Sequence, residues 1–481
     1  MTTTAVPVAG SGVLPDGFRI ALDPGVRWVD DGTILVGGAP IRLLRFTPTG
    51  RALIDRLAAG EPVSRSKGAQ SLARRLLDAG LAHPRPPVTD STPDVAIVIP
   101  VRNDAAGLAA TLTVLSDSAA IVVVDDASAD ANAVSPGVTR PGTTLLRRSV
   151  RGGPAAARND GWRATGAPFV AFVDANCEPE PGWLDVLVPH FADPQVAAVA
   201  PRILPPPDTE NSGALAAYEA VASPLDLGAK EAIVRPGSRV PYVPTAALVV
   251  RRSALAELGG FDEALTVGED VDFVWRLVAA GWTVRYEPRA IVRHPIRPGW
   301  MQWLQQRFRY GTSAAPLARR HAWAVAPAVM SPWSAASWAL MAAGQPLLGT
   351  VTAGCSTAVL AGRLPRGEAV RLAGLGHVRS GLALARALRR AWAPGAVILA
   401  VTARHNRPAR AALVAAVVVP GVVDWVRRRP RLDPARFAAL RLADDLAYAG
   451  GLWAGCARER SARALLPDLR PYAGPNSVAP N

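Results

Sequence analysis

Cysteine is scarce in this chain of 481 residues, which contains only Cys177, Cys355 and Cys456. Three cysteines so far apart can form neither a disulfide framework nor a C-x-x-C metal site, and a reducing cytosol suits this composition best. Lysine is also nearly absent, because all but Lys67 and Lys230 of the 53 basic residues are arginine. A bias of this kind can follow from a GC-rich genome as easily as from function.

Charged residues make up only 19% of the chain and aromatic residues 6%, whereas 49% are hydrophobic. This composition excludes disorder for most of the chain. The formal net charge of +14 suits nucleic acid, anionic lipid or a phosphorylated substrate. Nucleic acid is the weakest of these and we expect none, because the arginines are scattered and no binding module is recognisable. Residues 1–14 have neither a basic start nor a long apolar run, so we expect the catalytic part to stay inside the cell.

The first of three segments, residues 14–87, predicts a small α+β domain. Short strand-like runs come first, and two stretches of helical periodicity follow them. The expected strands are 19–22, 33–36 and 41–45, and the expected helices are 50–59 and 70–81. Pro84, Pro86 and Pro87 then form a stiff, extended linker.

The second segment, residues 94–315, predicts an α/β domain. Apolar, β-branched runs at 95–99, 121–124 and 169–173 alternate with helical stretches. Continuous runs of this kind are typical of strands buried on both faces, and their alternation with helices favours parallel pairing in one sheet.

The third segment, residues 321–470, is apolar and predicted to be helical. No charged residue occurs in the 41 positions from Ala322 to Gly362, where a membrane span needs about 20. We expect a membrane hairpin over 322–362 with both ends cytoplasmic, since arginines flank it; a water-soluble helical core is the alternative. Three shorter apolar runs predict amphipathic or buried helices, namely 394–402, 411–423 and 446–457.

Acidic residues follow two of the predicted strands. Asp125 and Asp126 come after the run 121–124, and Asp174 with Asn176 follows 169–173. Capping of the next helix is one explanation for such an acid, but two of these sites in one sheet favour a ligand at the carboxyl ends of the strands. A nucleotide-sugar donor explains the pair, since a carboxylate can bind a nucleobase or ribose and an Asp-x-Asp type turn can hold a hard cation against a diphosphate.

Two further motifs suit the same chemistry. A glycine-rich turn at 151–153 leads into a helix that carries Arg158, and arginine suits a diphosphate. Glu269 and Asp270 precede another apolar helix, whose dipole favours acids at its start. Asp270 would deprotonate an acceptor hydroxyl as general base, and we expect the helix N-terminus to help keep it ionised.

Together these motifs resemble a family-2 glycosyltransferase of GT-A fold over about residues 94–311. They occur in the family's order, as Val95–Pro100, Val124–Ser128, Arg158-Asn159-x-Gly161, Asp174–Asn176, and Gly260–Glu263 with Glu269-Asp270. The resemblance implies a GT-A type mixed sheet with flanking helices. It also implies Asp125 or Asp126 at the nucleobase, Asp174 at ribose and metal, and Asp270 as the catalytic base.

The family's metal and acceptor motifs are present with departures. Asn176 stands where the family usually has aspartate, so the divalent cation, Mg or Mn, would depend on Asp174, the diphosphate and His294, which is equally well a polar core histidine. Gln306-x-x-Arg309-Tyr310 is similar to the Gln-x-x-Arg-Trp motif of chain-extending members, with Tyr in place of Trp. Trp300 and Trp303, just before it, could stack on an acceptor sugar or anchor at a membrane interface.

The first segment resembles the winged-helix-like peptide-recognition domain of modified-peptide pathways, which binds a leader as an added strand. The motifs that carry this resemblance are Leu14–Ile20, Leu43–Gly50 and Leu76–Leu81. Joined to a family-2 transferase and an apolar tail, it looks like the mycofactocin-system glycosyltransferases of actinobacteria. That resemblance implies an inverting, metal-dependent enzyme that moves glucose from UDP-glucose to a peptide-derived cofactor precursor and builds an oligosaccharide at the cell membrane.

Two alternatives stay open. A membrane glycosyltransferase acting on a polyprenyl phosphate, lipid or cell-wall glycan would share the motifs, but a lipid acceptor gives no reason for a peptide-binding domain. A non-catalytic membrane scaffold that binds peptide and sugar nucleotide would need no general base, and the retention of Asp174, Glu269 and Asp270 speaks against it.

Overall fold

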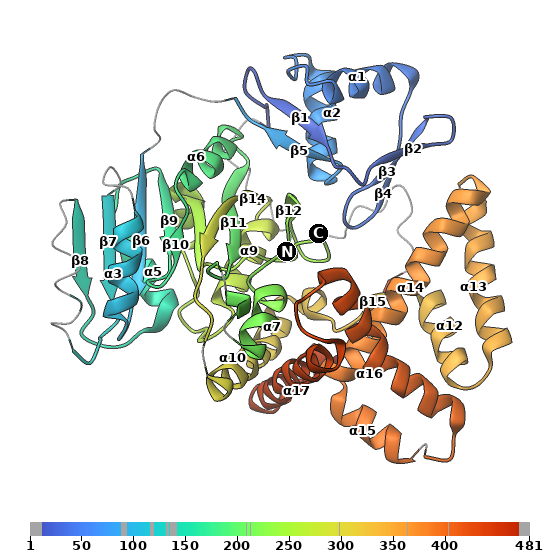
Figure 1. The fold of residues 1–481 in the computed structure, drawn as a ribbon. Helices are drawn as coiled ribbons and strands as arrows, with labels where there is room; N and C mark the ends of the chain where they lie inside the picture. The colour runs from blue at the N-terminus through green and yellow to red at the C-terminus, as the bar shows by residue number, and fades with distance from the viewer. Residues whose placement is uncertain are drawn as a thin grey trace, which may run out of the picture. The chain divides into compact units, whose positions relative to one another are not determined.

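The computed structural model describes most of the chain. The described residues are 12–87, 94–115, 120–130, 134, 142–207, 209–211, 213–297, 299–362, 364–402 and 404–470. They form two compact units (Figure 1), and each unit is described by itself. The first contains the chain up to Trp28, Thr33–Pro207 and Ala222–Ile296; the second contains Val29–Gly32, Asp208–Val221 and the chain from Arg297 onward.

A small α+β domain (blue in Figure 1) comes first in the chain. Its elements are β1 (Arg19–Leu22), β2 (Arg27–Val29), β3 (Ile34–Gly37), β4 (Arg42–Arg45), α1 (Pro48–Ala58), α2 (Lys67–Asp78) and β5 (Ala82–Arg85). β1 pairs antiparallel with β5, and β2, β3 and β4 form a second sheet in that order. Each helix begins at a hydroxyl that caps its first turn, Thr47 for α1 and Ser66 for α2. The apolar sides of both helices pack over Phe18, which is fully buried.

A nine-stranded mixed sheet, counted over the described residues, forms the core of the first unit. Its order is β10 (Glu178–Pro179), β14 (Thr283–Arg293), β11 (Val196–Leu204), β13 (Ala247–Arg251), β9 (Phe169–Val173), β6 (Val95–Val101), β7 (Ala120–Asp125) and β8 (Thr143–Arg147), with β12 (Ala232–Val234) also on β14. β9, β6, β7 and β8 are parallel, whereas β13 runs antiparallel between β9 and β11. The predicted mixed sheet is therefore confirmed.

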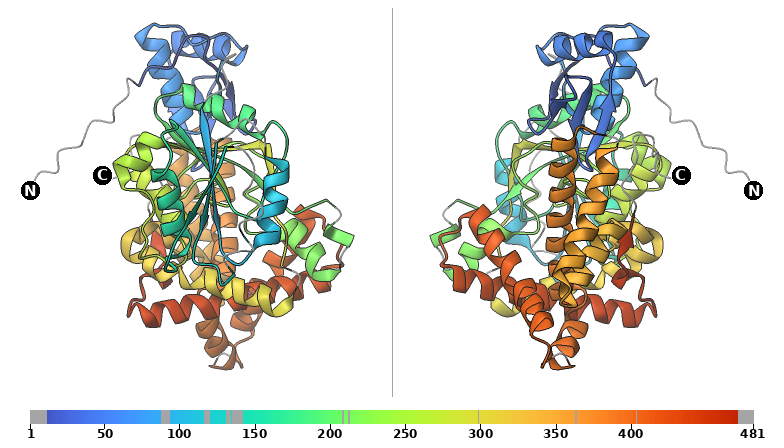
Figure 2. Two further views of the ribbon diagram at one scale, coloured as in Figure 1. Left: turned by 90° about the vertical axis from the view of Figure 1, so that its left-hand side faces the viewer. Right: turned by 90° about the vertical axis from the view of Figure 1, so that its right-hand side faces the viewer.

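Helices flank this sheet on both faces, as Figure 2 shows with the sheet on edge. They are α3 (Ala105–Val114), α5 (Gly153–Arg163), α6 (Trp183–Leu187), α8 (Arg252–Leu258), α9 (Glu269–Ala279) and the short η2 (Val188–Ala192). Alternate residues of β6 serve the two faces, since Ile97 packs with Leu108 of α3 while Val98 faces α5. A Cβ at Gly161 of α5 would overlap Val98, so glycine lets this helix lie close to the strand.

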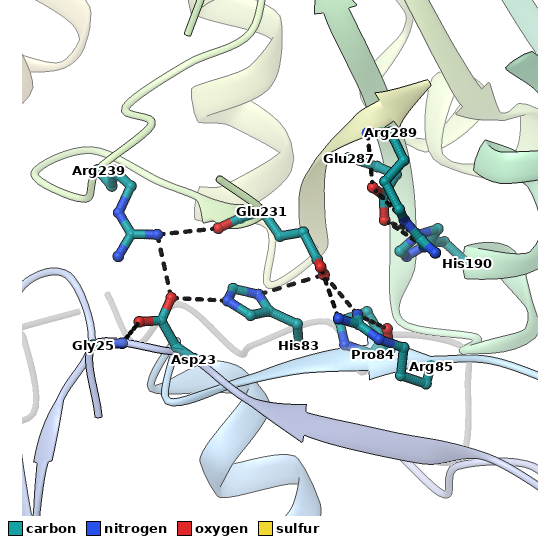
Figure 3. Close-up of polar contacts among 10 residues, drawn as sticks. All are labelled: Asp23, Gly25, His83, Pro84, Arg85, His190, Glu231, Arg239, Glu287 and Arg289. Carbon is teal, nitrogen blue, oxygen red and sulfur yellow. Dashed lines mark hydrogen bonds and ion pairs between the residues drawn. The ribbon is translucent and has the colours of Figure 1, made fainter. Parts of the chain in front are cut away.

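Partly buried ion pairs join the α+β domain to the sheet domain within the first unit (Figure 3). The Asp23 Oδ2 atom lies 2.9 Å from His83 Nε2 and 3.2 Å from Arg239 Nη1. Beside them, Arg85 donates two hydrogen bonds of 2.7 and 2.8 Å to the Glu231 carboxylate. Burial raises the pKa of Asp23, but hydrogen bonds from His83, a backbone N–H and Arg239 outweigh burial and hold that pKa well below its ordinary value. Charges therefore fix this junction.

The second unit is helical. Its elements are η3 (Thr209–Asn211), α7 (Ala214–Ala222), α10 (Trp300–Thr312), α11 (Ala314–Arg320), η4 (Ala322–Val325), β15 (Val329–Met330), α12 (Pro332–Ala342), α13 (Pro346–Ala361), α14 (Arg366–Arg390), α15 (Ala393–Thr402), α16 (Arg407–Arg428), α17 (Pro434–Arg458), η5 (Arg463–Leu465) and β16 (Asp468–Leu469). α10 and α17 cross with their backbones in contact, because a Cβ at Gly311 or Gly451 would overlap the facing backbone. The sequence assigned residues 297–315 to the sheet domain, whereas here α10 and α11 belong to the helical unit.

The uncharged stretch 322–362 differs from the predicted pair of membrane spans. α12 has 11 residues and α13 has 16, so they are about 16 and 24 Å long, whereas a hydrocarbon core is about 30 Å thick. Gly344, with a positive φ, and Pro346 break the run between them. Among the described residues α16 is the one helix long and apolar enough to cross a bilayer, and it contains the run 411–423 that was expected to be too short.

Candidate active site

The residues predicted to bind the donor and to act as the base come together at one edge of the mixed sheet. β7 ends at Asp125, and Asp174 directly follows β9. Because β7, β6 and β9 are parallel neighbours, these two ends lie at the same edge, where open α/β sheets bind ligands. Side chains from α5 and α9 reach the same place.

Arg158 of α5 connects two of the predicted acidic motifs. Its guanidinium is buried, with 4% of the residue exposed, and donates to Glu269 Oε1 at 2.9 Å and to Asp174 Oδ1 at 2.8 Å. Burial lowers the pKa of Arg158, but the charges of Asp174 and Glu269 and the hydrogen bond to Asp174 outweigh burial and raise it. Arg158 was predicted to bind the donor; the structure places it between the strand-end acid and the first residue of α9.

Asp270 lies next to this pair and carries a perturbed pKa. The N–H of Val271 donates to its Oδ1 atom at 2.8 Å. Burial and then the Glu269 charge raise the pKa of Asp270 to about 7, against the lowering by Val271 and Arg158. The sequence favoured a helix start that keeps Asp270 ionised, whereas burial and the second carboxylate dominate here. A carboxyl group that titrates near neutral pH suits a general base.

The carboxylates of Asp125 and Asp126 accept hydrogen bonds from other groups of the protein. Asp125 is fully buried, and it accepts hydrogen bonds from the N–H and hydroxyl of Ser128 and from Arg147. Asp126 accepts the N–H groups of Gly152 at 2.7 Å and Gly153 at 2.8 Å, at the start of α5. The helix-capping alternative therefore describes Asp126, and both acids shape the loop beside the site.

Two of the three predicted metal ligands, Asp174 and Asn176, are oxygen donors in the turn after β9. Asp174 has about a third of its side chain exposed, and Asn176 is half-buried in the turn that follows. His294 follows β14, where its Nδ1 atom hydrogen-bonds the Pro295 carbonyl oxygen at 2.8 Å. Over the described ranges no three His, Cys, Asp or Glu side chains cluster as metal ligands. Asp174 and Asn176 still fit a hard cation such as Mg²⁺, which uses few protein ligands and completes its shell with water and phosphate oxygens.

The predicted acceptor residues all lie on α10, in the helical unit. Trp300 is exposed, but Trp303 is 1% exposed and donates its Nε1 hydrogen to Glu219 at 2.9 Å. Trp303 is thus placed in the core rather than where a sugar could stack on it. Gln306 donates to the Tyr310 hydroxyl at 2.9 Å one turn away.

The core around Trp303 is built on charges that the sequence did not reveal. Arg307, which is also buried, binds Glu219 and lies 3.1 Å from Asp444 of α17. Arg309, the remaining residue of the motif, is exposed on α10. The chain-extension motif therefore surrounds a buried arginine that ties α7, α10 and α17 together.

Asn159 is a positioning residue to which the sequence assigned no role. Its side-chain amide donates to the Phe261 carbonyl at 2.8 Å, and its oxygen accepts the Phe261 N–H at 2.9 Å. It thereby holds the loop that leads to α9 and Asp270. A Cβ at Gly260 would overlap Asn159, so glycine is needed for this contact. The sequence offered one indication of this role, namely that Asn159 directly follows Arg158 in the motif Arg158-Asn159-x-Gly161.

Comparison with known proteins identifies the family of the chain. Residues 96–259 match the model of Glycosyl transferase family 2. The chain is similar to the pre-mycofactocin glycosyltransferases of two Mycobacterium tuberculosis strains, with 44% identity over 474 residues that cover 95% of this chain and 99% of each relative. It is also similar to the glycosyltransferase AglE of Haloferax volcanii, with 28% identity over 47% of this chain and 74% of that relative.

Among solved structures, the mannosyltransferase PcManGT from Pyrobaculum calidifontis, in complex with GDP-Man and Mn²⁺, matches 70% of this chain and 89% of its own. The identity is 20% and the TM-score 0.38. A likeness at that score carries no argument about function.

Proposed function

Since the chain belongs to the pre-mycofactocin glycosyltransferase family and contains a family-2 glycosyltransferase domain, we propose that it transfers glucose from UDP-glucose to pre-mycofactocin and builds an oligosaccharide on it. The observation that carries this proposal is the cluster of Asp174, Glu269 and Asp270 around Arg158, in a chain that aligns with that relative over nearly the whole length of both. A peptide-derived acceptor also gives the α+β domain a role.

In the proposed reaction Asp270 removes the proton of an acceptor hydroxyl. The acceptor oxygen then bonds to C1 of the glucose from the face opposite the phosphate. The bond between C1 and the phosphate oxygen breaks, and its electron pair leaves with UDP, so the configuration at C1 inverts. Glu269 contributes in two ways, because its charge raises the pKa of Asp270 and its carboxylate holds Arg158.

The donor would lie at the carboxyl ends of β7 and β9. Asp125 and Asp126 would shape the nucleobase end of its site through the loops that they hold, and Asp174 would contact the ribose. A divalent cation, Mg or Mn, held by Asp174 and Asn176 would neutralise charge on the departing diphosphate. The local surplus of carboxylates over Arg158 supports a cation here.

The α+β domain would recognise a peptide. β4 pairs with β3 on one side, and over the described residues no strand pairs with its other side. An extended leader or precursor segment could add to such an edge as a further strand, with backbone hydrogen bonds giving affinity. The charged junction at Asp23 and Glu231 would keep that peptide attached to the transferase domain.

We also propose that the enzyme works at the cytoplasmic face of the cell membrane, where α15 and the first half of α16 contact lipid. Val397, Ile398 and Val401 of α15 are each more than 60% exposed. Exposed arginines follow in the α15–α16 connection and the first turn of α16, where anionic lipid headgroups would meet them.

Contact in the plane of the membrane fits α16 better than a span. Arg389 donates to the Val417 carbonyl at 3.1 Å, and Arg386 binds Asp424 at 2.8 Å. These charged contacts tie the second half of α16 to α14, so the helix is held against the protein instead of being surrounded by lipid as a span would be.

The catalytic proposal is tested by incubating the purified chain with UDP-glucose and pre-mycofactocin. Mass spectrometry should detect the acceptor with one or more added hexoses, together with free UDP. Asp270→Asn should reduce transfer by about 10²–10⁴-fold while UDP binding stays nearly unchanged. Transfer to a polyprenyl phosphate, with none to pre-mycofactocin, would contradict the proposed acceptor.

The membrane proposal is tested by flotation with vesicles of phosphatidylcholine and phosphatidylglycerol. The wild type should float with these vesicles and less with phosphatidylcholine alone. Val397→Glu combined with Ile398→Glu should abolish flotation, whereas Val150→Glu, at an equally exposed valine of the first unit, should not. A wild type that stays at the bottom of the gradient would refute lipid contact.

A further inference from the structure

A cavity lies in the first unit, and none of the residues assigned to catalysis lines it. It has a volume of about 170 Å³ and lies among the end of α2, β12, the start of β14 and the end of α9. One part of its lining is polar, with Asp78, Gln195, Arg235 and Thr283. The other part is apolar and includes Val278 and Trp282.

Arg285 of β14 directly follows Thr283 and Val284, which line this cavity, but is not itself part of the lining. It is 2% exposed, and none of its three guanidinium nitrogens has a hydrogen-bond partner among the described residues. Thr283, two positions earlier on the same strand, lines the cavity, and the charges that act on Arg285 include those of Asp78 and Arg235 from the lining. Burial lowers the pKa of Arg285 to about 10, against the raising by the charges of Asp193 and Asp78.

The surroundings of Arg285 carry a surplus of positive charge. Arg235 donates one hydrogen bond, at 2.7 Å, to the Asp78 carbonyl, and its Nε and Nη2 atoms have no partner in the described part of the chain. Arg74 is already committed to Asp193 through hydrogen bonds of 2.8 and 3.0 Å. Asp193 and Asp78 are thus the two acids that act on Arg285, against the charges of Arg74 and Arg235, and burial raises the pKa of Asp78.

Two other charged residues of the same sheet, the half-buried Arg251 and the buried Glu287, have hydrogen-bond partners. Arg251 of β13 donates to the carbonyls of Val196, Phe191 and Asp193. Glu287, two residues after Arg285 on β14, binds His190 and Arg289, as Figure 3 shows. Buried polar groups in proteins are almost always hydrogen-bonded, and an exception requires an explanation such as a bound ion or ligand.

We propose that this cavity binds a carboxylate carried on a short apolar stem. Arg235 would donate charge-assisted hydrogen bonds to the carboxylate from the cavity wall, and Arg285 behind the wall would attract it through its charge. Val278 and Trp282 would contact the stem. The carboxylate could belong to a free organic acid or to the C-terminus of a peptide, since α2 of the α+β domain forms part of the wall. This site is independent of the proposed glycosyl transfer.

The test is thermal unfolding of the full chain with butyrate and with butyramide, which has the same shape without the charge. Butyrate should raise the Tm of the wild type by at least about 2 °C, and butyramide should not. Arg285→Met should remove the butyrate shift and raise the Tm in the absence of ligand, because it removes an unpaired buried charge. Arg235→Gln, at the half-buried side of the cavity, should weaken the shift even if the first variant folds poorly.

Arg251→Met is the matched control. It removes a half-buried arginine whose hydrogen bonds are satisfied, so it should lower the Tm and keep the full butyrate shift. A peptide that ends in leucine, tested as the free acid and as the C-terminal amide, distinguishes a peptide C-terminus from a free organic acid as the ligand. A Tm shift with the peptide acid but not with its amide identifies a C-terminus. A Tm shift with butyrate but with neither peptide identifies a small acid. Equal shifts with acid and amide probes, or a butyrate shift that survives in Arg285→Met, would overturn the proposal.

Discussion

Two buried arginines of the first unit have opposite surroundings. Arg158 lies among Asp174, Glu269 and Asp270, so carboxylates outnumber the cation and the pKa of Arg158 is raised. Arg285 lies among further arginines with few acids, and its pKa is lowered. Burying a charge is costly unless it is paired, and the protein provides the partners at only one of the two places.

The difference shows what each place lacks. The side chains around Arg158 carry a net negative charge. A divalent cation, or a base that gains a proton, would reduce this charge. Around Arg285 the surplus is positive, and an anion would reduce it. Because the two surpluses have opposite signs, substitutions at the two arginines should have opposite effects on stability, which makes the comparison testable.

The largest effect is expected for Arg158→Met. Removing the cation leaves Asp174, Glu269 and Asp270 together without compensation, so the free energy of unfolding should fall by about 3–5 kcal/mol. Transfer should fall by at least about 10²-fold, because the acids lose their common anchor. Urea unfolding and a transfer assay measure both quantities.

Arg158→Lys keeps the charge but not the planar fork that reaches both carboxylates, so it should recover stability more than activity. Arg163→Met, at an exposed arginine of the same helix, is the control and should change neither quantity much. If Arg158→Met were as stable as the wild type, the contrast with Arg285 would fail.

Sequence patterns predicted the parts of the molecule that depend on local order. The β-branched runs at 95–99, 121–124 and 169–173 gave the parallel strands, and the acids after them lie at one sheet edge, because topology alone brings parallel strand ends together.

Other features depend on partners that are distant in the chain. Trp303 is buried because Glu219, 84 residues earlier, accepts its hydrogen bond, and no pattern near Trp303 reveals that. The raised pKa of Asp270 and the unpartnered Arg285 follow from burial, which composition does not report. The break in the uncharged stretch 322–362 depends on one glycine and one proline whose effect hydropathy ignores.

A smaller effect, on UDP binding, is expected when the Asp174 carboxylate is removed from the acidic cluster around Arg158. If this acid holds the cation, Asp174→Ala should weaken Mn²⁺-supported UDP binding by about 10–100-fold, and Asn176→Ala should weaken it much less, because a charged oxygen binds a hard ion better than an amide. Titration calorimetry with and without Mn²⁺ measures this. Equal losses of UDP affinity in the two variants, or wild-type UDP binding that is independent of Mn²⁺, would show that the net negative charge around Arg158 does not bind a cation.

The smallest effect, and the finest test of the comparison, concerns the proton on Asp270. A general base acts when it is deprotonated, so kcat/KM should rise with pH through a midpoint near 7, the raised pKa of Asp270 in the free enzyme. Glu269 is the second cause of that raised pKa, after burial. Glu269→Gln removes its charge, so the midpoint should move to lower pH, by about one unit.

Asp185→Asn is the control. It removes an acid from the first turn of α6 that is not among the groups acting on the pKa of Asp270, so it should leave the midpoint unchanged. A midpoint that stayed near 7 in Glu269→Gln would mean that burial alone sets the pKa of Asp270. The acids would then be independent of one another, and Arg158 would balance only the two carboxylates that it touches.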